Sequence, residues 1–570
     1  MKSDKPFSLG GNLDLIPDEF ETVKGKVDSV FEDKTEEFGL LGQKAYNINV
    51  IDLNGDDYSD IVLIPSFYSQ PKFFLFDIHQ KKFIETQSPF EKSFKVSFIL
   101  FYDLNQDKII DAVTGVLNQD SEMSKQPLRV FYGNRDKNKK LSLKEKISFK
   151  DSTPISSAAL IDFDLDGKLD IFVGNWFEKF KNTKLPSRDR LYQNTGTEYK
   201  DVSHLLLDES KQNESQTMFV NSSPTYGVQV CDMDQNGFPD LVTTSTNKYQ
   251  NKLWMNRYKF REKYRYFENY GVSSGVAGDA DGLINTQGGG RTFGVACTDY
   301  NNDGIMDLFL GELTHNYDSE GTDRSSLLTG RTFNFPPLFY RTEYFSDSDD
   351  PNWHQADRRG VWVDLNNDGL LDLIVDNSGY PPHTRLIVFE QQPDHSFTNM
   401  SKEYGVDIVN PIATVIADFN RDGKMDFLTS QSEIRDETIK TRLYLFQNNM
   451  NLDKRKSLRF YLRGKKANYH GLNATITLKV KTTEGISNRK QIVSYSYGAL
   501  PPQNEEGVHF GVNENETVVS VSVRWPYSTS LNQGRAGLEK TYQLNIKFQD
   551  FMNVTLCEDG QYLIGRRECF

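Results

Sequence analysis

One nine-residue pattern recurs seven times in this chain and places oxygen-bearing side chains at its positions 1, 3, 5 and 9. Positions 1 and 9 are Asp in every copy, positions 3 and 5 are Asp or Asn, and position 6 is Gly in five copies. With a backbone carbonyl at position 7, each copy offers five or six oxygen ligands, which suits a hard cation of flexible coordination such as Ca²⁺. The copies begin at Asp52, Asp103, Asp162, Asp232, Asp299, Asp364 and Asp418.

The motif therefore predicts up to seven Ca²⁺ sites. Mg²⁺ is less suited because it holds its waters and demands octahedral geometry, and Zn²⁺ is disfavoured because no His or Cys occupies a ligand position. Six copies carry three carboxylates at these positions and one carries four, and such groups repel one another without a cation. The candidate ligands are Asp52, Asn54, Asp56 and Asp60; Asp103, Asn105, Asp107 and Asp111; Asp162, Asp164, Asp166 and Asp170; Asp232, Asp234, Asn236 and Asp240; Asp299, Asn301, Asp303 and Asp307; Asp364, Asn366, Asp368 and Asp372; and Asp418, Asn420, Asp422 and Asp426.

An EF-hand loop and a simple polar turn fit the motif less well than a Ca²⁺ loop between two strands. An EF-hand needs a bidentate Glu at position 12, and position 12 is Leu, Thr or Val in every copy. Turn formation by Asp, Asn and Gly would account for one copy, but not for Asp at positions 1 and 9 in all seven. Asp57 and Lys108 replace Gly at position 6 of the first two copies, and the cation of Lys108 makes the Asp103 copy the candidate for the weakest or empty site.

The spacing of the motif indicates a radial all-β fold. Successive copies start 51 to 70 residues apart, which is enough for four short strands and their turns. An apolar run precedes each copy and another follows it, as expected for two strands joined by a tight loop. We therefore predict a seven-bladed β-propeller over residues 16–450, with one motif in each blade.

A fourth strand in the blades is marked by an aromatic residue just ahead of a small polar cluster, as around Phe83, Tyr199 and Phe397. The same signal occurs near the start of the chain, around Phe20. Only two clear strands follow the last motif. We therefore expect the Phe20 strand to complete the seventh blade and close the ring, which removes exposed sheet edges.

After the propeller the pattern changes to strict alternation, as in ATITLKVKT and VVSVSVRW. Alternation predicts a small all-β domain with one wet face, over residues 455–530. Residues 1–15 are predicted to be an N-terminal segment, and residues 531–570 a C-terminal tail. His509 lies near one of the alternating strands and is interpreted as structural rather than as a metal ligand.

The four cysteines form two candidate pairs. Cys557 and Cys569 are expected to form a disulfide that holds the C-terminus. Cys231 and Cys297 lie on equivalent strands of adjacent blades with opposite side-chain parity, so they could face one another. Buried free thiols are the favoured state of this second pair, and a bridge is the alternative.

Sequons and the N-terminal residues bear on the compartment. The first residues contain no apolar signal-peptide core, so the chain is either not secreted or is a secreted form whose leader is missing. We expect an extracellular protein whose leader is not present in this chain. Six N-x-S/T sequons give weak support to this route. They lie at Asn213, Asn221, Asn399, Asn473, Asn515 and Asn553.

The repeated motif resembles the FG-GAP/VCBS repeats of integrin α-chain propellers and related secreted proteins. The stretch from Leu458 to Pro526 resembles the ASPIC/UnbV domain, on the evidence of LRFYLRGKKANYHGLNATITL, VHFGV and VSVRWP. Leu472 and Asn473 stand where that domain usually has Gly-Ala. The combination is similar to the cartilage acidic protein family, and this resemblance implies an extracellular Ca²⁺-binding glycoprotein.

Charge and motif content narrow the function. The net charge of −14 argues against nucleic acid or an anionic membrane surface as the main partner, and no apolar run is long enough to span a membrane. The sequence contains no HExxH or GxSxG motif and no phosphate-cradling loop, so we expect a non-enzymatic protein. The leading prediction is an adhesive, matrix or structural module whose partners are other extracellular proteins or glycans, or further copies of itself. A lectin-like propeller and the scaffold subunit of an enzyme are the alternatives.

Overall fold

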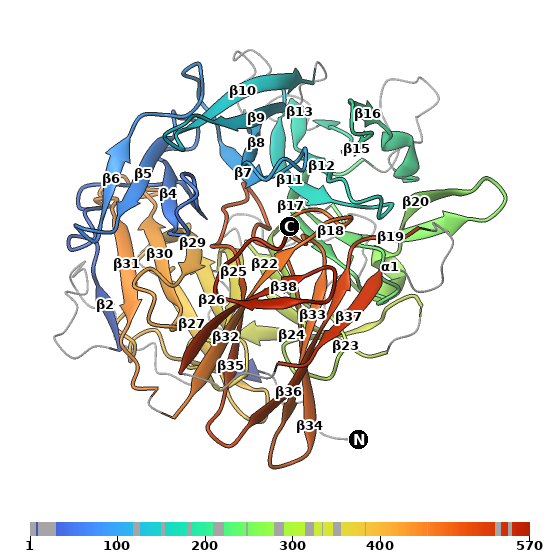
Figure 1. The fold of residues 1–570 in the computed structure, drawn as a ribbon. Helices are drawn as coiled ribbons and strands as arrows, with labels where there is room; N and C mark the ends of the chain where they lie inside the picture. Colours follow the sequence, from blue (N-terminus) through green and yellow to red (C-terminus); the bar gives the residue numbers. More distant parts are fainter. Residues whose placement is uncertain are drawn as a thin grey trace.

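The structure is a computed structural model, in which each Asp/Asn motif joins two antiparallel strands of a four-stranded sheet. It describes residues 7–8, 30–117, 126–149, 154–179, 185–208, 222–246, 249–278, 290–313, 324–332, 335–345, 355–381, 383–452, 454–529, 537–544 and 550–570. Seven such sheets are present in these ranges, and they are the blades of a β-propeller, as predicted (Figure 1).

The blades are numbered along the chain. Blade 1 contains β3 (Asn47–Ile51), β4 (Asp60–Ile64), β5 (Lys72–Asp77) and β6 (Lys82–Thr86); blade 2 contains β7 (Phe98–Tyr102), β8 (Asp111–Gly115), β9 (Arg129–Arg135) and β10 (Leu141–Ser148); blade 3 contains β11 (Ile155–Ile161), β12 (Asp170–Asn175), β15 (Arg190–Asn194) and β16 (Tyr199–Asp201); blade 4 contains β17 (Thr225–Cys231), β18 (Asp240–Ser245), β19 (Lys252–Lys259) and β20 (Tyr264–Asn269). Blade 5 contains β21 (Thr292–Thr298), β22 (Asp307–Glu312), β23 (Ser326–Gly330) and β24 (Phe339–Phe345), with β1 (Phe7–Ser8) added parallel to β24; blade 6 contains β25 (Asp357–Val363), β26 (Asp372–Asn377), β27 (Leu386–Gln391) and β28 (Phe397–Asn399); blade 7 contains β29 (Pro411–Ala417), β30 (Asp426–Gln431), β31 (Leu443–Asn448) and β2 (Phe31–Asp33). A two-stranded sheet of β13 (Phe177–Lys179) and β14 (Leu185–Pro186), a 3-10 turn at Ser203–Leu205 and the short helix α1 (Gly271–Ser274) decorate the blades.

The first strand of each blade lies nearest the propeller axis. Strands β7 (FILFY) and β11 (ISSAALI) are buried along their whole length, which explains why they alternate so little between apolar and polar residues. Strand β3 contacts both β7 and β29, so the first and last blades are neighbours and the ring closes.

Blade 7 takes its outer strand from the N-terminal part of the chain. Strand β2 pairs antiparallel with β31, and Phe31 lies opposite Asn448. The sequence predicts closure by a strand around Phe20, which lies outside the described residues. The observed closing strand is Phe31–Asp33, and Phe31 is fully buried against the ring of Phe427.

The closing strand carries a local hydrogen bond that other outer strands share. Asp33 Oδ1 accepts the backbone N–H of Thr35 at 3.1 Å, just as Asp201 Oδ1 accepts that of Ser203 at 2.9 Å. The signal for an outer strand is therefore an aromatic residue followed at alternate positions by Asp or Asn and by Ser or Thr. Phe31 begins such a series, whereas Phe20 is followed by Glu and Thr at adjacent positions.

The C-terminal part of the chain folds as two four-stranded sheets packed face to face. One contains β35 (Val508–Val512), β32 (Lys456–Arg463), β38 (Phe551–Cys557) and β39 (Tyr562–Ile564), and the other β34 (Ile486–Ile492), β33 (Thr475–Lys481), β36 (Thr517–Trp525) and β37 (Leu538–Tyr542). Apolar side chains of both sheets, such as Phe460 and Trp525, are fully buried between them. Residues 538–564, which the sequence pattern assigns to a tail, instead supply β37, β38 and β39 to this sandwich.

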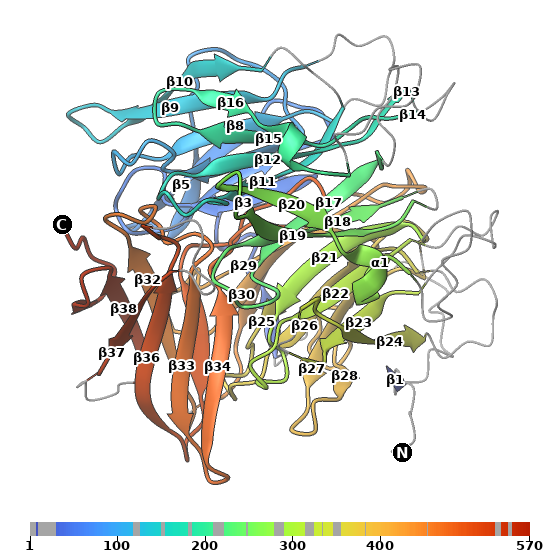
Figure 2. The ribbon, with the colours of Figure 1, turned by 90° about the vertical axis from the view of Figure 1, so that its right-hand side faces the viewer.

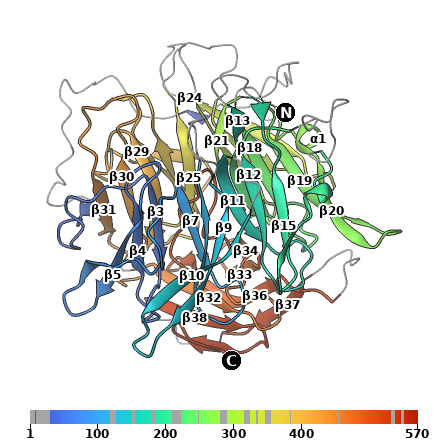
Figure 3. The ribbon, with the colours of Figure 1, turned by 90° about the horizontal axis from the view of Figure 1, so that it is seen from above.

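The sandwich lies against the side of the propeller that carries the motifs, as Figures 2 and 3 show for the strands labelled β32, β33, β34, β36, β37 and β38. Its segment 497–505 enters the axial channel and hydrogen-bonds to the first strands of six blades. Gln503, for example, exchanges backbone hydrogen bonds with Ile48 and Val50 of blade 1, at 3.0 and 2.8 Å. The two domains therefore share one continuous buried interface.

Both cysteine pairs form disulfides. The Cys557–Cys569 bridge was expected and anchors the last residues to β38. Cys231 and Cys297 are also bridged, with their Cα atoms 6.5 Å apart, so the preference for free thiols in this pair is wrong. The opposite parity of the two residues on β17 and β21 turns their side chains toward each other across adjacent blades.

In the described part of the chain, no helix has the length and apolar character that crossing a membrane requires.

Candidate metal-binding loops

All seven motifs fold into the same tight loop. The Oδ2 atom of the position 1 aspartate accepts the backbone N–H of position 6 in every copy, at 2.8 to 3.0 Å. Positions 4 and 6 have positive φ in every copy, including Asp57 at 70° and Lys108 at 68°. Gly at position 6 adopts this conformation without strain, which explains its recurrence there.

The position 9 aspartate connects three strands. In every copy its Oδ2 accepts the backbone N–H of position 2, at 2.8 to 3.2 Å. Its Oδ1 accepts a backbone N–H from the third strand of the blade, at 2.7 to 2.9 Å. A carboxylate has about four lone-pair sites, so this structural role leaves room for a metal ion on the same group.

Three carboxylates converge in two of the loops. Ligand atoms of Asp162, Asp164 and Asp166 lie within 4.8 Å of one another, and so do those of Asp232, Asp234 and Asp240. The described residues of the other five loops do not bring three carboxylates that close together. The difference follows from position 3, which is Asp in these two loops and Asn in the others.

Asn at position 3 pairs with the carboxylate at position 5. Nδ2 of Asn54 donates to Asp56 at 2.8 Å, and Nδ2 of Asn301 donates to Asp303 at 3.0 Å. The amide at position 3 therefore satisfies an oxygen of the position 5 carboxylate. In the Asp162 loop, position 3 is itself a carboxylate, so the two negative groups face each other. Half a turn of a position 3 amide about its Cβ–Cγ bond would present its oxygen to a cation instead.

Burial makes these loops unfavourable places for negative charge. It raises the pKa of Asp60 and of Asp307 to about 8, and that of Asp111 to about 7. For Asp162, burial and the neighbouring Asp164 and Asp166 carboxylates raise the pKa well above its usual range. A counter-charge is needed to keep such groups ionised.

The donor set fits a hard cation. The loops offer carboxylate, amide and carbonyl oxygens, and no nitrogen or sulfur ligand, which is the chemistry that Ca²⁺ prefers. One carboxylate oxygen, Oδ1, is buried without a hydrogen-bond partner in each of Asp232 and Asp299. An orphaned buried carboxylate oxygen is costly and is satisfied when a cation binds to it.

Lys108 does not neutralise its own loop. Its ammonium group donates to the backbone carbonyl of Phe570 and lies 3.4 Å from the Glu568 carboxylate. The cation that the sequence places beside the Asp103 site thus lies against the C-terminal residues.

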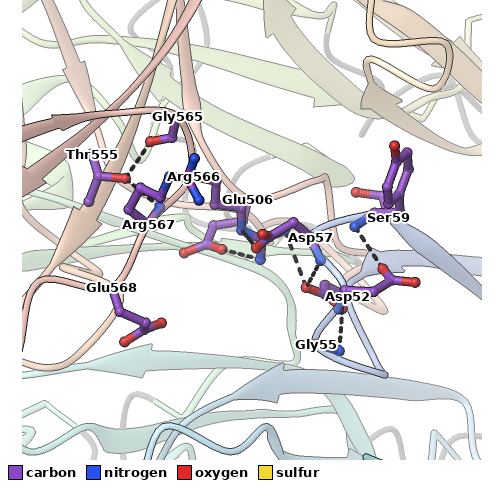
Figure 4. Close-up of polar contacts among 12 residues, drawn as sticks. Asp52, Gly55, Asp57, Ser59, Glu506, Thr555, Gly565, Arg566, Arg567 and Glu568 are labelled. Carbon is purple, nitrogen blue, oxygen red and sulfur yellow. Dashed lines mark hydrogen bonds and ion pairs between the residues drawn. The ribbon is translucent and has the colours of Figure 1, made fainter.

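The Asp52 loop instead faces a cation from the sandwich. Arg566 Nη1 lies 3.5 Å from Asp52 Oδ2, and its Nε lies 3.8 Å from Asp57 Oδ1 (Figure 4). The same guanidinium donates to Glu506 at 2.7 Å. Arg566 thereby links a loop of blade 1 to the buried Glu506 of the sandwich.

Similar contacts recur around the ring. Arg524 of β36 lies 3.6 Å from Asp232 Oδ2. Burial raises the pKa of Asp299 and of Asp418 to about 7, while Lys490 of β34 and Arg459 of β32, respectively, oppose the rise. The sandwich thus presents basic side chains to the position 1 aspartates of several loops.

The Asp162 loop faces an amide instead. Asn473 Oδ1 accepts the backbone N–H of Asp162 at 3.1 Å. This loop also has four carboxylates at its ligand positions, the largest number in the chain. The Asp162 loop thus has the most ligand-position carboxylates of the seven, and its neighbour in the sandwich, Asn473, is uncharged.

The basic side chains over the loops were not identified from the sequence. They lie far along the chain from the motifs and follow no shared spacing, so no local pattern marks them. The one available signal is in β36, where Arg524 stands between the apolar residues Val523 and Trp525. The double role of the position 9 aspartate was also missed, although its invariance in all seven copies hinted at it.

Comparison with known proteins gives two family matches. The FG-GAP-like repeat model matches residues 103–173 and 364–429, and each match runs from one motif through the next. The ASPIC and UnbV model matches residues 464–547. No curated protein sequence is significantly similar to the chain.

Two solved structures are examples of those that match the chain. BBS1N in complex with ARL6DN, soaked with lead, is 11% identical over 74% of this chain and 99% of that one, with a TM-score of 0.40. The exotype rhamnogalacturonan lyase YesX is 11% identical over 71% of this chain and 72% of that one, with a TM-score of 0.36. Similarity this distant says nothing about what this protein binds or does. The family matches do, however, define its composition: the chain combines FG-GAP-like repeats, folded as a β-propeller, with an ASPIC and UnbV domain.

Proposed function

We propose that this protein is a non-enzymatic extracellular module that binds up to seven Ca²⁺ ions and whose propeller binds other macromolecules. The observation that carries the proposal is the convergence of three carboxylates within 4.8 Å in the Asp162 loop and again in the Asp232 loop. Oxygen atoms gathered in this way are the ligands that Ca²⁺ takes in proteins.

The shared geometry supports extending the proposal to the other five loops. Positions 1 and 9 accept the same backbone N–H groups in all seven, so an ion held between them would meet equivalent oxygens in each blade. Such an ion would tie the end of the first strand to the third strand. Its role would be to stabilise the blade, because binding to the folded state alone raises stability.

The surface that remains open supports a binding role on the outside of the propeller. The sandwich covers the loop side, and its segment 497–505 occupies the axial channel that many propellers use for ligands. Partners would therefore meet the opposite face or the outer strands of the blades.

The two disulfides support an oxidising, extracellular setting. Among the predicted sequons, Asn515 is exposed, so it is a suitable glycan acceptor. Asn473 is 8% exposed and hydrogen-bonded to Asp162, so a glycan on it would conflict with the fold. Asn213 and Asn221 lie outside the described residues.

Direct measurement of bound Ca²⁺ tests the proposal. Titration calorimetry on EDTA-stripped protein should show several sites, and the melting temperature in millimolar Ca²⁺ should lie well above that in EDTA. Asp232→Asn should remove one site, whereas Asp394→Asn, in an exposed turn outside the loops, should remove none. No binding heat together with equal melting temperatures would refute calcium binding.

A lectin-like role is the second candidate. It is favoured by aromatic and basic side chains that share one face of the β19–β20 hairpin of blade 4, where Lys259 lies 5.5 Å from the ring centroids of Tyr264 and Tyr266.

A further inference from the structure

The outer edge of blades 4 and 5 carries a concentration of exposed aromatic and apolar side chains. Of the thirteen large apolar residues exposed in the described structure, five lie between residues 260 and 340, and Phe260 and Tyr340 are 73% and 58% exposed. The β19–β20 hairpin that ends near Phe260 projects from the body of the propeller in two views (Figures 1 and 3).

One face of this hairpin alternates aromatic rings with cations. Lys259 lies opposite Tyr264 in the strand register, and Arg257 lies opposite Tyr266, so all four side chains share a face. The Lys259 ammonium lies 5.5 Å from the centroid of each tyrosine ring, and the two rings are 6.2 Å apart.

The neighbouring blade extends this face. The Arg257 guanidinium stacks 3.7 Å from the ring centroid of Phe335, which is 38% exposed. The same Phe335 ring contacts Tyr270 edge-on at 4.7 Å. We call the surface formed by Arg257, Lys259, Tyr264, Tyr266 and Phe335 the aromatic-basic platform.

The local charge is opposite to that of the whole protein. Residues 257–266 contain five basic residues and one acidic residue, in a chain whose net charge is −14. Lys259, Arg261 and Lys263 form no ion pair with a carboxylate among the described residues. The hairpin therefore presents positive charge to solvent, which attracts anionic partners.

We propose that the aromatic-basic platform binds an anionic polysaccharide. Sugar rings would stack on the half-buried rings of Tyr264 and Tyr266, and their carboxylate or sulfate groups would pair with Lys259 and its basic neighbours. The proposal rests on the proposed function as a binding module and names the partner class. The two disulfides are compatible with the oxidising, extracellular setting of the proposed function, where a glycan is the polyanion that offers both rings and charges.

An acidic polypeptide is the competing partner. It would use the cations but has no need of two adjacent tyrosine rings. The contribution of the rings therefore separates the two partners.

The test is immobilised binding of the full chain at physiological salt and fixed Ca²⁺. The probes are heparin, hyaluronan, neutral dextran and polyglutamate. One double variant, Lys259→Gln with Lys263→Gln, removes charge, and another, Tyr264→Ser with Tyr266→Ser, removes rings. The matched control is Lys137→Gln with Lys140→Gln, at the exposed tip of the basic β9–β10 hairpin.

The proposal expects binding to heparin or hyaluronan and none to dextran. Each platform variant should weaken binding by about tenfold, and the control should change it less than about twofold. Melting temperatures equal to the parent protein would show that the variants remain folded.

Polyglutamate binding that the ring variant leaves unchanged would overturn the proposal in favour of an acidic protein. It would also be overturned if no anionic glycan binds, or if the control loses as much affinity as the platform variants. Ca²⁺ binding should be measured on the same preparation. A protein that binds Ca²⁺ but no anionic glycan would contradict the platform proposal and leave the proposed Ca²⁺ binding intact.

Discussion

Arg566 and Asp52 join the two domains through a cation held 3.5 Å from a candidate metal ligand. Nη2 of the same guanidinium donates to Glu506 at 2.7 Å. Burial alone would raise the pKa of Glu506, but Arg463, Arg566 and His470 hold it well below its usual range, so Glu506 stays ionised. A metal ion in the Asp52 loop and Arg566 would share one carboxylate, so we expect occupancy of the loop and docking of the sandwich to be thermodynamically linked.

Arg566→Gln should reveal that linkage. The variant breaks a largely buried ion pair, and such losses cost about 3 kcal/mol. The decrease in the free energy of unfolding should be greater in EDTA than in saturating Ca²⁺, because Asp52 relies on Arg566 for its counter-charge when no ion is bound. Urea unfolding in the two conditions measures both values.

Arg567→Gln is the matched control, since Arg567 is the adjacent residue but is exposed. It should change the free energy of unfolding by less than about 0.5 kcal/mol. An equal loss for Arg566→Gln with and without Ca²⁺ would show that the loop and the interface are independent.

The Asp162 loop should be the last to release its ion. It has four carboxylates at the ligand positions, one of which pairs with Lys168 of the same loop, and the sandwich presents Asn473 to it rather than a cation. Asp164→Asn should lower the affinity of this loop, and Asn301→Asp should raise that of the Asp299 loop, each by about tenfold, because ligand charge tunes Ca²⁺ affinity. Native mass spectrometry across buffered Ca²⁺ concentrations counts the ions retained.

Asn138→Asp provides the control for the added charge, because Asn138 lies in an exposed turn outside the motifs. It should leave the count of retained ions unchanged at every Ca²⁺ concentration. Identical release curves for the parent, Asp164→Asn and Asn301→Asp would contradict the ranking of the loops.

The position 9 aspartate should matter for folding even without metal. Asp426 accepts the backbone N–H groups of Phe419 and Asn448, at 3.0 and 2.8 Å. In Asp426→Asn one acceptor becomes an NH₂ group that faces a buried donor, which should cost about 2 kcal/mol in EDTA.

Asn420→Ala, at exposed position 3 of the same loop, is the comparison. It should cost less than about 1 kcal/mol in EDTA, because its hydrogen bond to Asp422 is exposed. Denaturant unfolding in EDTA measures both variants, and equal losses would mean that the position 9 carboxylate has no structural role of its own.

The parts of the structure that sequence predicts are those that short-range chemistry determines. A carboxylate at position 1, a positive φ at position 6 and an apolar strand on each side lie within about a dozen residues, so the motif from Asp162 predicts both its loop and its blade. Seven copies then set the number of blades. The bridge at Cys557 and Cys569 was predictable for the same reason, since the two residues are close in sequence.

Long-range packing accounts for what was missed. Arg566 reaches Asp52 only because β38 and β39 join the sandwich, and β38 pairs in parallel with β32 across about ninety residues. Residues 551–564 do carry a local hairpin signal, Asp559-Gly560 between two apolar runs, but nothing local indicates that β38 pairs with β32. Likewise, the closing strand at Phe31 is set by pairing with β31 near the far end of the propeller. An aromatic residue ahead of a polar cluster does not separate it from Phe20, and only the alternate spacing of Asp33 and Thr35 does.

His509 should make the protein sensitive to mild acid. Its Nε2 lies 2.7 Å from Asn367 Oδ1 of blade 6, which confines the ring to a structural role. Burial, reinforced by the charge of Arg459 on the adjacent strand, lowers the pKa of His509 from 6.5 to about 3. The native state therefore holds the imidazole neutral in the range where the unfolded chain protonates it.

Protonation of the unfolded chain sets the sign of the effect. Because the unfolded state binds a proton below pH 6.5 and the native state does not, stability falls as the pH drops from 6.5 toward 3. At pH 5 this single group should cost about 2 kcal/mol relative to pH 7. His509→Gln can still donate to Asn367 and has no proton to gain, so its loss of stability between pH 7 and pH 5 should be smaller than that of the parent by about this amount. Urea unfolding of both proteins in saturating Ca²⁺ isolates the difference, and parallel pH profiles would mean that the imidazole is protonated inside the fold.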